Sequence, residues 1–229
     1  MSENIMLETK DIVQSFPVAE GEFYALKNIN IKIKKGCLTI LRGRSGSGKT
    51  TLMNILGALD MPKSGQALLN GKDLVAMSER ERENIRKTVI GFVFQSVALI
   101  PMMTAYENVE FALRLAGYKE NRKERTREVL SMVGLGKRMN HMPQELSGGE
   151  QQRVAIARAI AHKPDIIFAD EPTAELDTAT SIQVMKIFKK LVESEGITIV
   201  MTTHDVGLME IADCIYELED GEIIDGNEQ

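Results

Sequence analysis

A glycine-rich segment between an apolar run and a helical pattern constrains this sequence most. Residues 43–50 read Gly-Arg-Ser-Gly-Ser-Gly-Lys-Thr, which fits the pattern G-x-x-x-x-G-K-[ST]. The apolar run Leu38–Leu41 precedes it, and a pattern that predicts a helix over about 49–59 follows. Glycines allow successive backbone N–H groups to point inward at phosphate oxygens, and the start of a helix adds positive partial charge. The segment therefore predicts a P-loop, and with it the α/β core of a nucleoside-triphosphate hydrolase.

Two residues at the end of this P-loop would carry its chemistry. The Lys49 ammonium would neutralise the β- and γ-phosphates, and the Thr50 hydroxyl can ligate Mg²⁺. The sequence contains no Asn-Lys-x-Asp guanine-reading motif, so ATP and Mg²⁺ are the expected ligands. The loop residues expected to contact the nucleotide are Gly43, Arg44, Ser45, Gly46, Ser47, Gly48, Lys49, Thr50 and Thr51.

The order of elements along the 229 residues predicts a single domain, 1–229, with an insertion. Strand patterns fill the first forty residues, helical patterns dominate 78–162 except for a strand at 89–94, and strands alternate with helices from 164 onward. Ser78-Glu79-Arg80-Glu81 fits a capped helix start. We expect a mixed-sheet α/β core with an N-terminal antiparallel β subdomain, about 1–95 and 164–229, and an α-helical subdomain, about 96–163. Other expected helices are 104–116, 121–133, 149–161 and 178–195.

Composition narrows the function classes. The formal net charge of −5 disfavours a broad basic surface and therefore a nucleic-acid partner. Cys37 and Cys214 are the only cysteines, which suits a reducing compartment and gives no disulfide framework. No apolar run approaches the ~20 residues that span a bilayer, and the N-terminus has no signal-peptide order. We expect a cytosolic chain, able to sit on the inner face of a membrane through an integral partner.

Polar side chains follow three predicted strands. Asp170 and Glu171 come directly after Ile166–Ala169, where the ligands of open α/β sheets bind. Asp170 would hold Mg²⁺ through water, and Glu171 would polarise the attacking water. Gln95 could ligate Mg²⁺ or the water through its amide oxygen, and His204 could contact the γ-phosphate or the water. For Gln95 and His204, a purely structural role at a strand end stays open at this point.

The segment Leu146–Arg153, Leu-Ser-Gly-Gly-Glu-Gln-Gln-Arg, resembles the signature sequence of ATP-binding-cassette ATPases. In the same family order, Ile166–Glu171 resembles the Walker B strand with its catalytic glutamate, and Ala174–Asp177 resembles the D-loop. Gln95 corresponds to the Q-loop residue and His204 to the H-switch. The resemblance covers residues 43–204, and it implies ATP hydrolysis with Glu171, His204, Gln95 and Lys49 as the catalytic residues.

The signature adds a second site for the nucleotide. A helix that begins near residue 148 offers another phosphate-binding N-terminus. The resemblance implies that two copies pair head to tail, each ATP lying between one P-loop and the other copy's signature, and that a separate membrane permease is driven. The signature residues expected at the nucleotide are Ser147, Gly148, Gly149 and Glu150. Phe16 is the expected aromatic partner of the base, with Tyr24 as its rival.

Smaller features suggest a branch of this family. Tyr24–Lys27, Gly91–Gln95 and Leu99–Val109 resemble bacterial cassettes for lipoprotein release, macrolide efflux and antimicrobial-peptide resistance. Glu175 departs from the family pattern and adds a carboxylate near the expected dimer seam. The apolar stretch Ser96–Met103 would either receive a short helix of the membrane subunit or pack inside the helical subdomain. The alternative function is a soluble cassette ATPase that acts on DNA or ribosomes.

Overall fold

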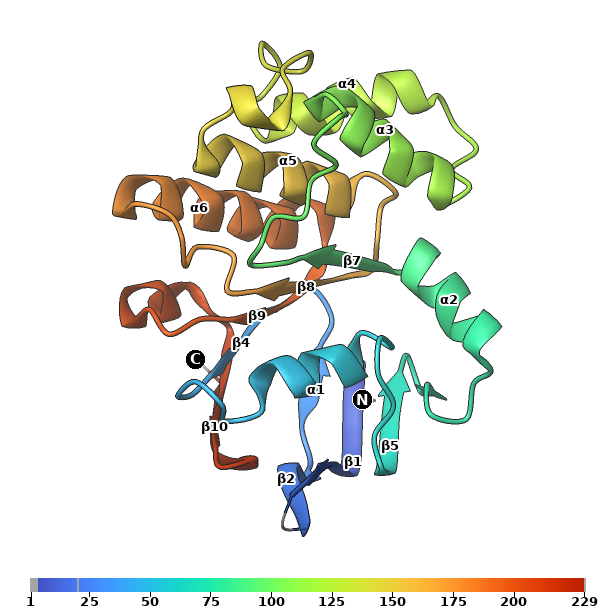
Figure 1. Ribbon diagram of the computed structural model, residues 1–229, viewed down its shortest axis with the longest axis vertical. Coiled ribbons are helices and arrows are strands. Elements are labelled where there is room, and N and C mark those ends of the chain that lie inside the picture. The colour runs from blue at the N-terminus through green and yellow to red at the C-terminus, as the bar shows by residue number, and fades with distance from the viewer. Residues whose placement is uncertain (1–3, 20, 229) are drawn as a thin grey trace.

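The computed structural model describes residues 4–19 and 21–228. Its larger sheet has six strands in the order β11-β10-β4-β9-β8-β7 (Figure 1). Strands β10, β4, β9, β8 and β7 run parallel, and β11 is antiparallel to β10 at the edge. The strands are β4 (Leu38–Arg42), β7 (Ile90–Val93), β8 (Ile166–Asp170), β9 (Thr198–Thr202), β10 (Cys214–Glu219) and β11 (Glu222–Glu228). The predicted edge hairpin around Asp220-Gly221 is confirmed.

Both faces of this sheet are buried, which explains the apolar runs of its central strands. In β8, Ile167 and Ala169 pack into a core shared with the helices above the sheet. Ile166 and Phe168 point to the other face and pack with helix α1 (Lys49–Leu56). Side chains alternate between the faces of a strand, so one strand joins two separate hydrophobic cores.

A second sheet lies below α1, so that α1 is held between the two sheets (Figure 1). Its order is β2-β1-β5-β6, with β3 also paired to β1, and the pairings are antiparallel. The strands are β1 (Ile5–Val18), β2 (Gly21–Ile29), β3 (Lys32–Lys34), β5 (Ser64–Leu69) and β6 (Lys72–Asp73). The mixed α/β core and the antiparallel N-terminal sheet are confirmed.

The helices between residues 105 and 195 cover the opposite side of the larger sheet, whereas the helix at 79–88 packs through Ile85 toward the core around α1 (Figure 1). Capping boxes fix the starts of α2, α3 and α5, because in each a Ser or Thr hydroxyl and a Glu carboxylate satisfy the first amides. The helices are α2 (Glu79–Thr88), α3 (Ala105–Leu115), α4 (Arg122–Met132), α5 (Gly148–Ile160) and α6 (Thr178–Glu195), with short 3₁₀ turns at Pro143–Glu145 and Val206–Ile211. The division into a core of about 1–95 and 164–229 and a helical subdomain of about 96–163 stays a prediction.

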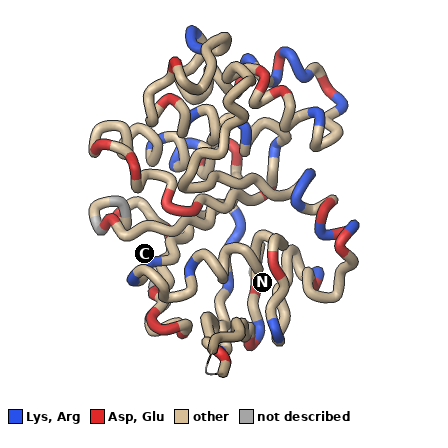
Figure 2. The backbone as a smooth tube through the Cα atoms, in the orientation of Figure 1, with Lys and Arg blue, Asp and Glu red and all other residues tan. Residues whose placement is uncertain are grey.

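Two boundaries differ from the sequence prediction. The helix expected over 49–59 ends at Leu56, because Gly57 caps it and Ala58 turns the chain at a φ of 57°. The sequence predicts strand patterns throughout the first forty residues, but Asn30 and Ile31 lie outside any strand, since β3 is limited to Lys32–Lys34. In the described ranges, no helix combines the length and apolarity needed to cross a bilayer. Acidic and basic residues are interspersed along the described backbone (Figure 2).

Candidate nucleotide-binding and hydrolysis site

The P-loop joins the carboxyl end of β4 to α1 and packs against β2. Gly48 has a φ of 104°, and a Cβ placed there would lie 2.5 Å from the Ala25 carbonyl oxygen. Only glycine therefore fits this position. Gly48 provides no side-chain cap, and the first turn of α1 contains no acidic residue. The start of α1 is thus free of any carboxylate of its own, as an anion-binding N-terminus requires.

Lys49 is buried and points back across the loop. Its Nζ donates hydrogen bonds to the carbonyl oxygens of Gly43, at 2.8 Å, and Arg44, at 2.9 Å. Burial lowers the pKa of Lys49, and the Glu171 and Asp170 carboxylates oppose that shift. A desolvated ammonium held only by neutral carbonyls favours an approaching anion.

A hydroxyl–carboxylate chain connects the P-loop to two sheet strands. The Thr50 hydroxyl donates to Oδ2 of Asp170 at 3.2 Å, and the Thr202 hydroxyl donates to Oδ1 of Asp170 at 2.6 Å. Asp170 and Thr202 are direct partners in the β8–β9 register. The hydroxyl and carboxylate oxygens beside the loop are the hard ligands that Mg²⁺ prefers, and a site with few protein ligands is typical because phosphates and waters complete it.

Glu171 occupies a strained backbone position. Its φ is 42°, which costs a non-glycine residue of order 1 kcal/mol or more. Its N–H donates to the Thr202 hydroxyl at 2.9 Å, and the His204 Nδ1 lies 3.2 Å from its Oε2. Thr202 therefore fixes both acidic residues. Sequence reasoning missed Thr202, because only the strand register reveals that it faces Asp170.

Gln95 follows the neighbouring strand end. Val93 of β7 pairs with Ala169 of β8, so the chain leaves β7 beside the Asp170–Glu171 turn. Within the described chain, the exposed Gln95 side chain has no hydrogen-bond partner. The next residues are held from α5, since the Arg158 guanidinium donates to the carbonyl oxygens of Val97, at 3.0 Å, and Ala98, at 2.5 Å.

The signature segment forms the start of α5. Ser147 is the N-cap: its hydroxyl accepts from the Glu150 N–H at 3.3 Å, and the Glu150 carboxylate accepts from the Ser147 N–H at 2.9 Å. A Cβ on Gly149 would collide with Cγ2 of Thr180, so glycine is needed where α5 approaches α6. The start of α5 lies above α6 and the larger sheet, whereas the P-loop lies below that sheet (Figure 1).

The two aromatic candidates for the base share the β1–β2 hairpin, Ser15 pairing with Tyr24 and Phe16 with Phe23. Phe16 is 40% exposed and Tyr24 is 47% exposed, so both rings are accessible. The hairpin adjoins the P-loop through the Ala25–Gly48 contact. Phe16 as the base-stacking residue stays a prediction.

A P-loop beside a strand that ends in Asp-Glu, with a second glycine-rich helix start on an inserted helical layer, defines a cassette-type P-loop ATPase. Residues 26–174 match the family described as ABC transporter. The chain therefore belongs to the ABC transporter ATP-binding family, and it is an ATPase.

Several known proteins are similar to this chain over nearly its full length. An uncharacterized ABC transporter ATP-binding protein of Methanocaldococcus jannaschii, MJ1508, is 48% identical over 96% of this chain and 98% of its own. The macrolide export ATP-binding/permease protein MacB of Syntrophobacter fumaroxidans is 44% identical over 95% of this chain, which spans only 31% of that protein. A solved dimeric structure of the cassette MJ0796, bound to ADP and Pi in a post-hydrolysis state, superposes with a TM-score of 0.91 at 41% identity, covering 97% of this chain and 98% of that one.

Proposed function

We propose that two copies of this chain close head to tail around two ATP molecules and thereby drive a separate integral-membrane permease. One observation carries the proposal: the starts of α1 and α5 lie on opposite sides of the larger sheet within one chain (Figure 1). A single chain therefore cannot hold one triphosphate with both helix N-termini, whereas a two-fold dimer brings each P-loop to the other copy's signature. The solved structure of the similar cassette is dimeric, which supports the pairing of two copies.

The residues around the P-loop have separate roles in hydrolysis. Lys49 exchanges its carbonyl partners for phosphate oxygens, and the carboxylate of Glu171 accepts a hydrogen bond from the attacking water. His204 steadies Glu171 through the 3.2 Å contact. Thr50, Gln95 and Asp170, the last through water, would hold Mg²⁺. When bound, this cation supplies charge neutralisation at the phosphate oxygens.

The permease contact would place the chain peripherally on the cytoplasmic side of the cell membrane. In the stretch 96–103, Met102 is 83% exposed, whereas Leu99 packs partly against the helical core. Beside it, a 360 Å³ groove is lined by apolar residues such as Phe94 and Leu115. Its basic lining residues already have partners, because Arg86 pairs with Glu79, Lys87 pairs with Glu83, and Arg158 donates to backbone carbonyls. The apolar part of the lining therefore leads us to expect a short amphipathic helix of the partner. Relatives named for macrolide export favour an export-type cargo.

The dimer is tested with Glu171→Gln, which removes the charge that polarises water but keeps the shape. We expect ATP affinity to persist, turnover to fall at least ~100-fold, and an ATP-dependent dimer to accumulate in sedimentation analysis. Full turnover in this variant would contradict the assigned role of Glu171. A strictly monomeric variant at saturating ATP would contradict the dimer.

The partner is tested by cross-linking in intact cells, followed by membrane fractionation and identification of the linked protein. An integral-membrane protein linked through the groove, and lost on Leu115→Glu, would support the permease. Recovery with ribosomes or DNA, independent of Leu115, would support the soluble alternative instead.

A further inference from the structure

Two exposed side chains of opposite charge lie next to the site. Arg44 is part of the P-loop, and Glu175 lies in the turn between Glu171 and α6. Within the described part of the chain, neither side chain has an ion-pair or hydrogen-bond partner. By contrast, Asp177 in the same turn is occupied, because it caps α6 through the Thr180 N–H and hydroxyl.

The turn that contains Glu175 packs against the start of the signature helix α5. Backbone bonds from Ala174 N–H to Glu171 and from Leu176 N–H to Thr173 hold the turn rigidly. Leu176 lies against Gly148, since a Cβ on that glycine would sit 4.0 Å from Cδ2 of Leu176. A surface that covers the beginning of α5 therefore passes close to the turn that contains Glu175.

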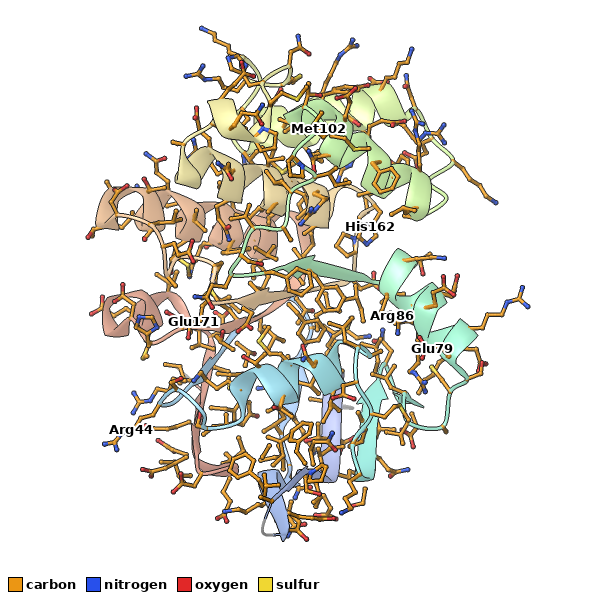
Figure 3. All side chains as sticks on the ribbon, in the orientation of Figure 1. Arg44, Glu79, Arg86, Met102, His162 and Glu171 are labelled. Carbon is orange, nitrogen blue, oxygen red and sulfur yellow. The ribbon has the colours of Figure 1, made fainter. Side chains whose placement is uncertain are left out.

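Arg44 has the matching position on the P-loop. Its carbonyl oxygen accepts from Lys49 Nζ and from the Ser47 N–H, so the backbone is fixed while the side chain extends outward at the edge of the molecule (Figure 3). Arg44 shares a 300 Å³ depression with Glu219 and Asp220. Glu217 also lines this depression, and Arg44 is the one cation among the described lining residues, so a carboxylate that approaches here can pair only with Arg44.

We propose that Arg44 of one copy pairs with Glu175 of the second copy when the dimer closes. The inference rests on the proposed head-to-tail dimer, because an arrangement that sets a P-loop on the partner's signature also sets Arg44 on the turn beside it. Two-fold symmetry produces the pair twice. Each pair joins the phosphate loop of one copy to the turn that follows Glu171 in the other, and thereby adds a specific electrostatic lock to closure.

Charge reversal tests the pair in the hydrolysis-blocked Glu171→Gln background at saturating ATP. Arg44→Glu alone and Glu175→Arg alone each turn two attractions into two repulsions, and each should raise the dimer dissociation constant about 10-fold. The double variant Arg44→Glu/Glu175→Arg restores opposite charges and should return to within about 3-fold of the parent. The dissociation constants are measured by sedimentation velocity over a range of protein concentrations.

Matched controls are Arg80→Glu and Glu195→Arg, which make the same charge changes at exposed positions without an ion pair among the described residues. Neither variant should shift the dimer dissociation constant. A double variant as weak as the product of the single effects would overturn the pair, as would single reversals without effect in a parent that dimerises. A parent that stays monomeric would overturn the dimer and the pair together. Weaker ATP binding by monomeric Arg44→Glu, with Glu175→Arg inert, would assign Arg44 to the nucleotide instead.

Discussion

The helices α1 and α5 both begin at glycine-rich segments, yet their first turns are arranged in opposite ways. At α1, Gly48 contributes no side chain and no acid lies in the first turn. At α5, Ser147 and Glu150 form a reciprocal capping box, and Glu150 also pairs with Arg138 at 3.2 Å. The first N-terminus is open to an anion, whereas the second already holds the carboxylate of its own chain.

This difference suggests that the N-terminus of α1 serves nucleotide binding, whereas that of α5 serves dimer formation. A phosphate can enter the α1 site of a lone chain, because Lys49 and the open amides attract it and nothing must leave. At α5, the Glu150 carboxylate already satisfies the Ser147 N–H, and this hydrogen bond, followed by the Arg138 cation, lowers the pKa of Glu150. An N-terminus whose first amides are already capped offers fewer free donors to another anion. We therefore expect nucleotide affinity to depend on α1 and dimer affinity on α5.

The largest expected effect is at the open site. Lys49→Ala removes a buried ammonium and its charge-assisted bonds, so ATP affinity of the monomer should fall at least ~100-fold, as measured by calorimetric titration. Because burial disfavours this charge in the free fold, thermal melting should change little. Lys72→Ala removes an exposed lysine as a control and should bind ATP normally. Unchanged ATP affinity in Lys49→Ala would contradict the interpretation of the α1 N-terminus as the open phosphate site.

The next largest effect, a loss in kcat, is expected where Arg158 of α5 contacts the segment that follows Gln95. The Arg158 guanidinium holds two adjacent residues in the left-handed region, Val97 at a φ of 54° and Ala98 at 48°. Arg158→Lys keeps the charge but loses the fork that binds both carbonyls. The strained segment after Gln95 should then relax, lowering kcat about 10-fold with little change in the KM for ATP.

Arg125 provides the matched control for Arg158. It is a buried arginine that, like the half-buried Arg158, donates to two carbonyls, here those of Ile160 and Ala161, but it lies away from the Gln95 segment. Arg125→Lys should lower the melting temperature without the kcat defect. Equal kcat losses in both variants would show that Arg158 acts through stability alone.

The local motifs could be predicted from sequence, and the contacts between distant segments could not. The P-loop, Asp170-Glu171 and the signature are contiguous patterns, so each was placed on the correct element. The role of Thr202 depends on β9 lying between β4 and β8, and the grip of Arg158 depends on how α5 packs beside β7. The residue pattern of one segment predicts whether it is a helix or a strand, but not which distant segment it packs against. The Ser-x-x-Glu pattern at 147–150 did contain a usable signal, since the same pattern predicted the cap at Ser78–Glu81.

The smallest expected effect tests the capped site. Ser147→Ala removes the hydroxyl from α5 but leaves α1 untouched, so monomer affinity for ATP should stay within about 2-fold while the Glu171→Gln dimer weakens about 5-fold. Ser78→Ala removes the equivalent hydroxyl from the capping box of α2. Both variants should lose about 1 kcal/mol of stability, but only the first should affect the dimer. If Ser78→Ala weakened the dimer as much as Ser147→Ala, the loss of a helix cap would explain both results. The difference between the open N-terminus of α1 and the capped N-terminus of α5 would then not account for dimer affinity.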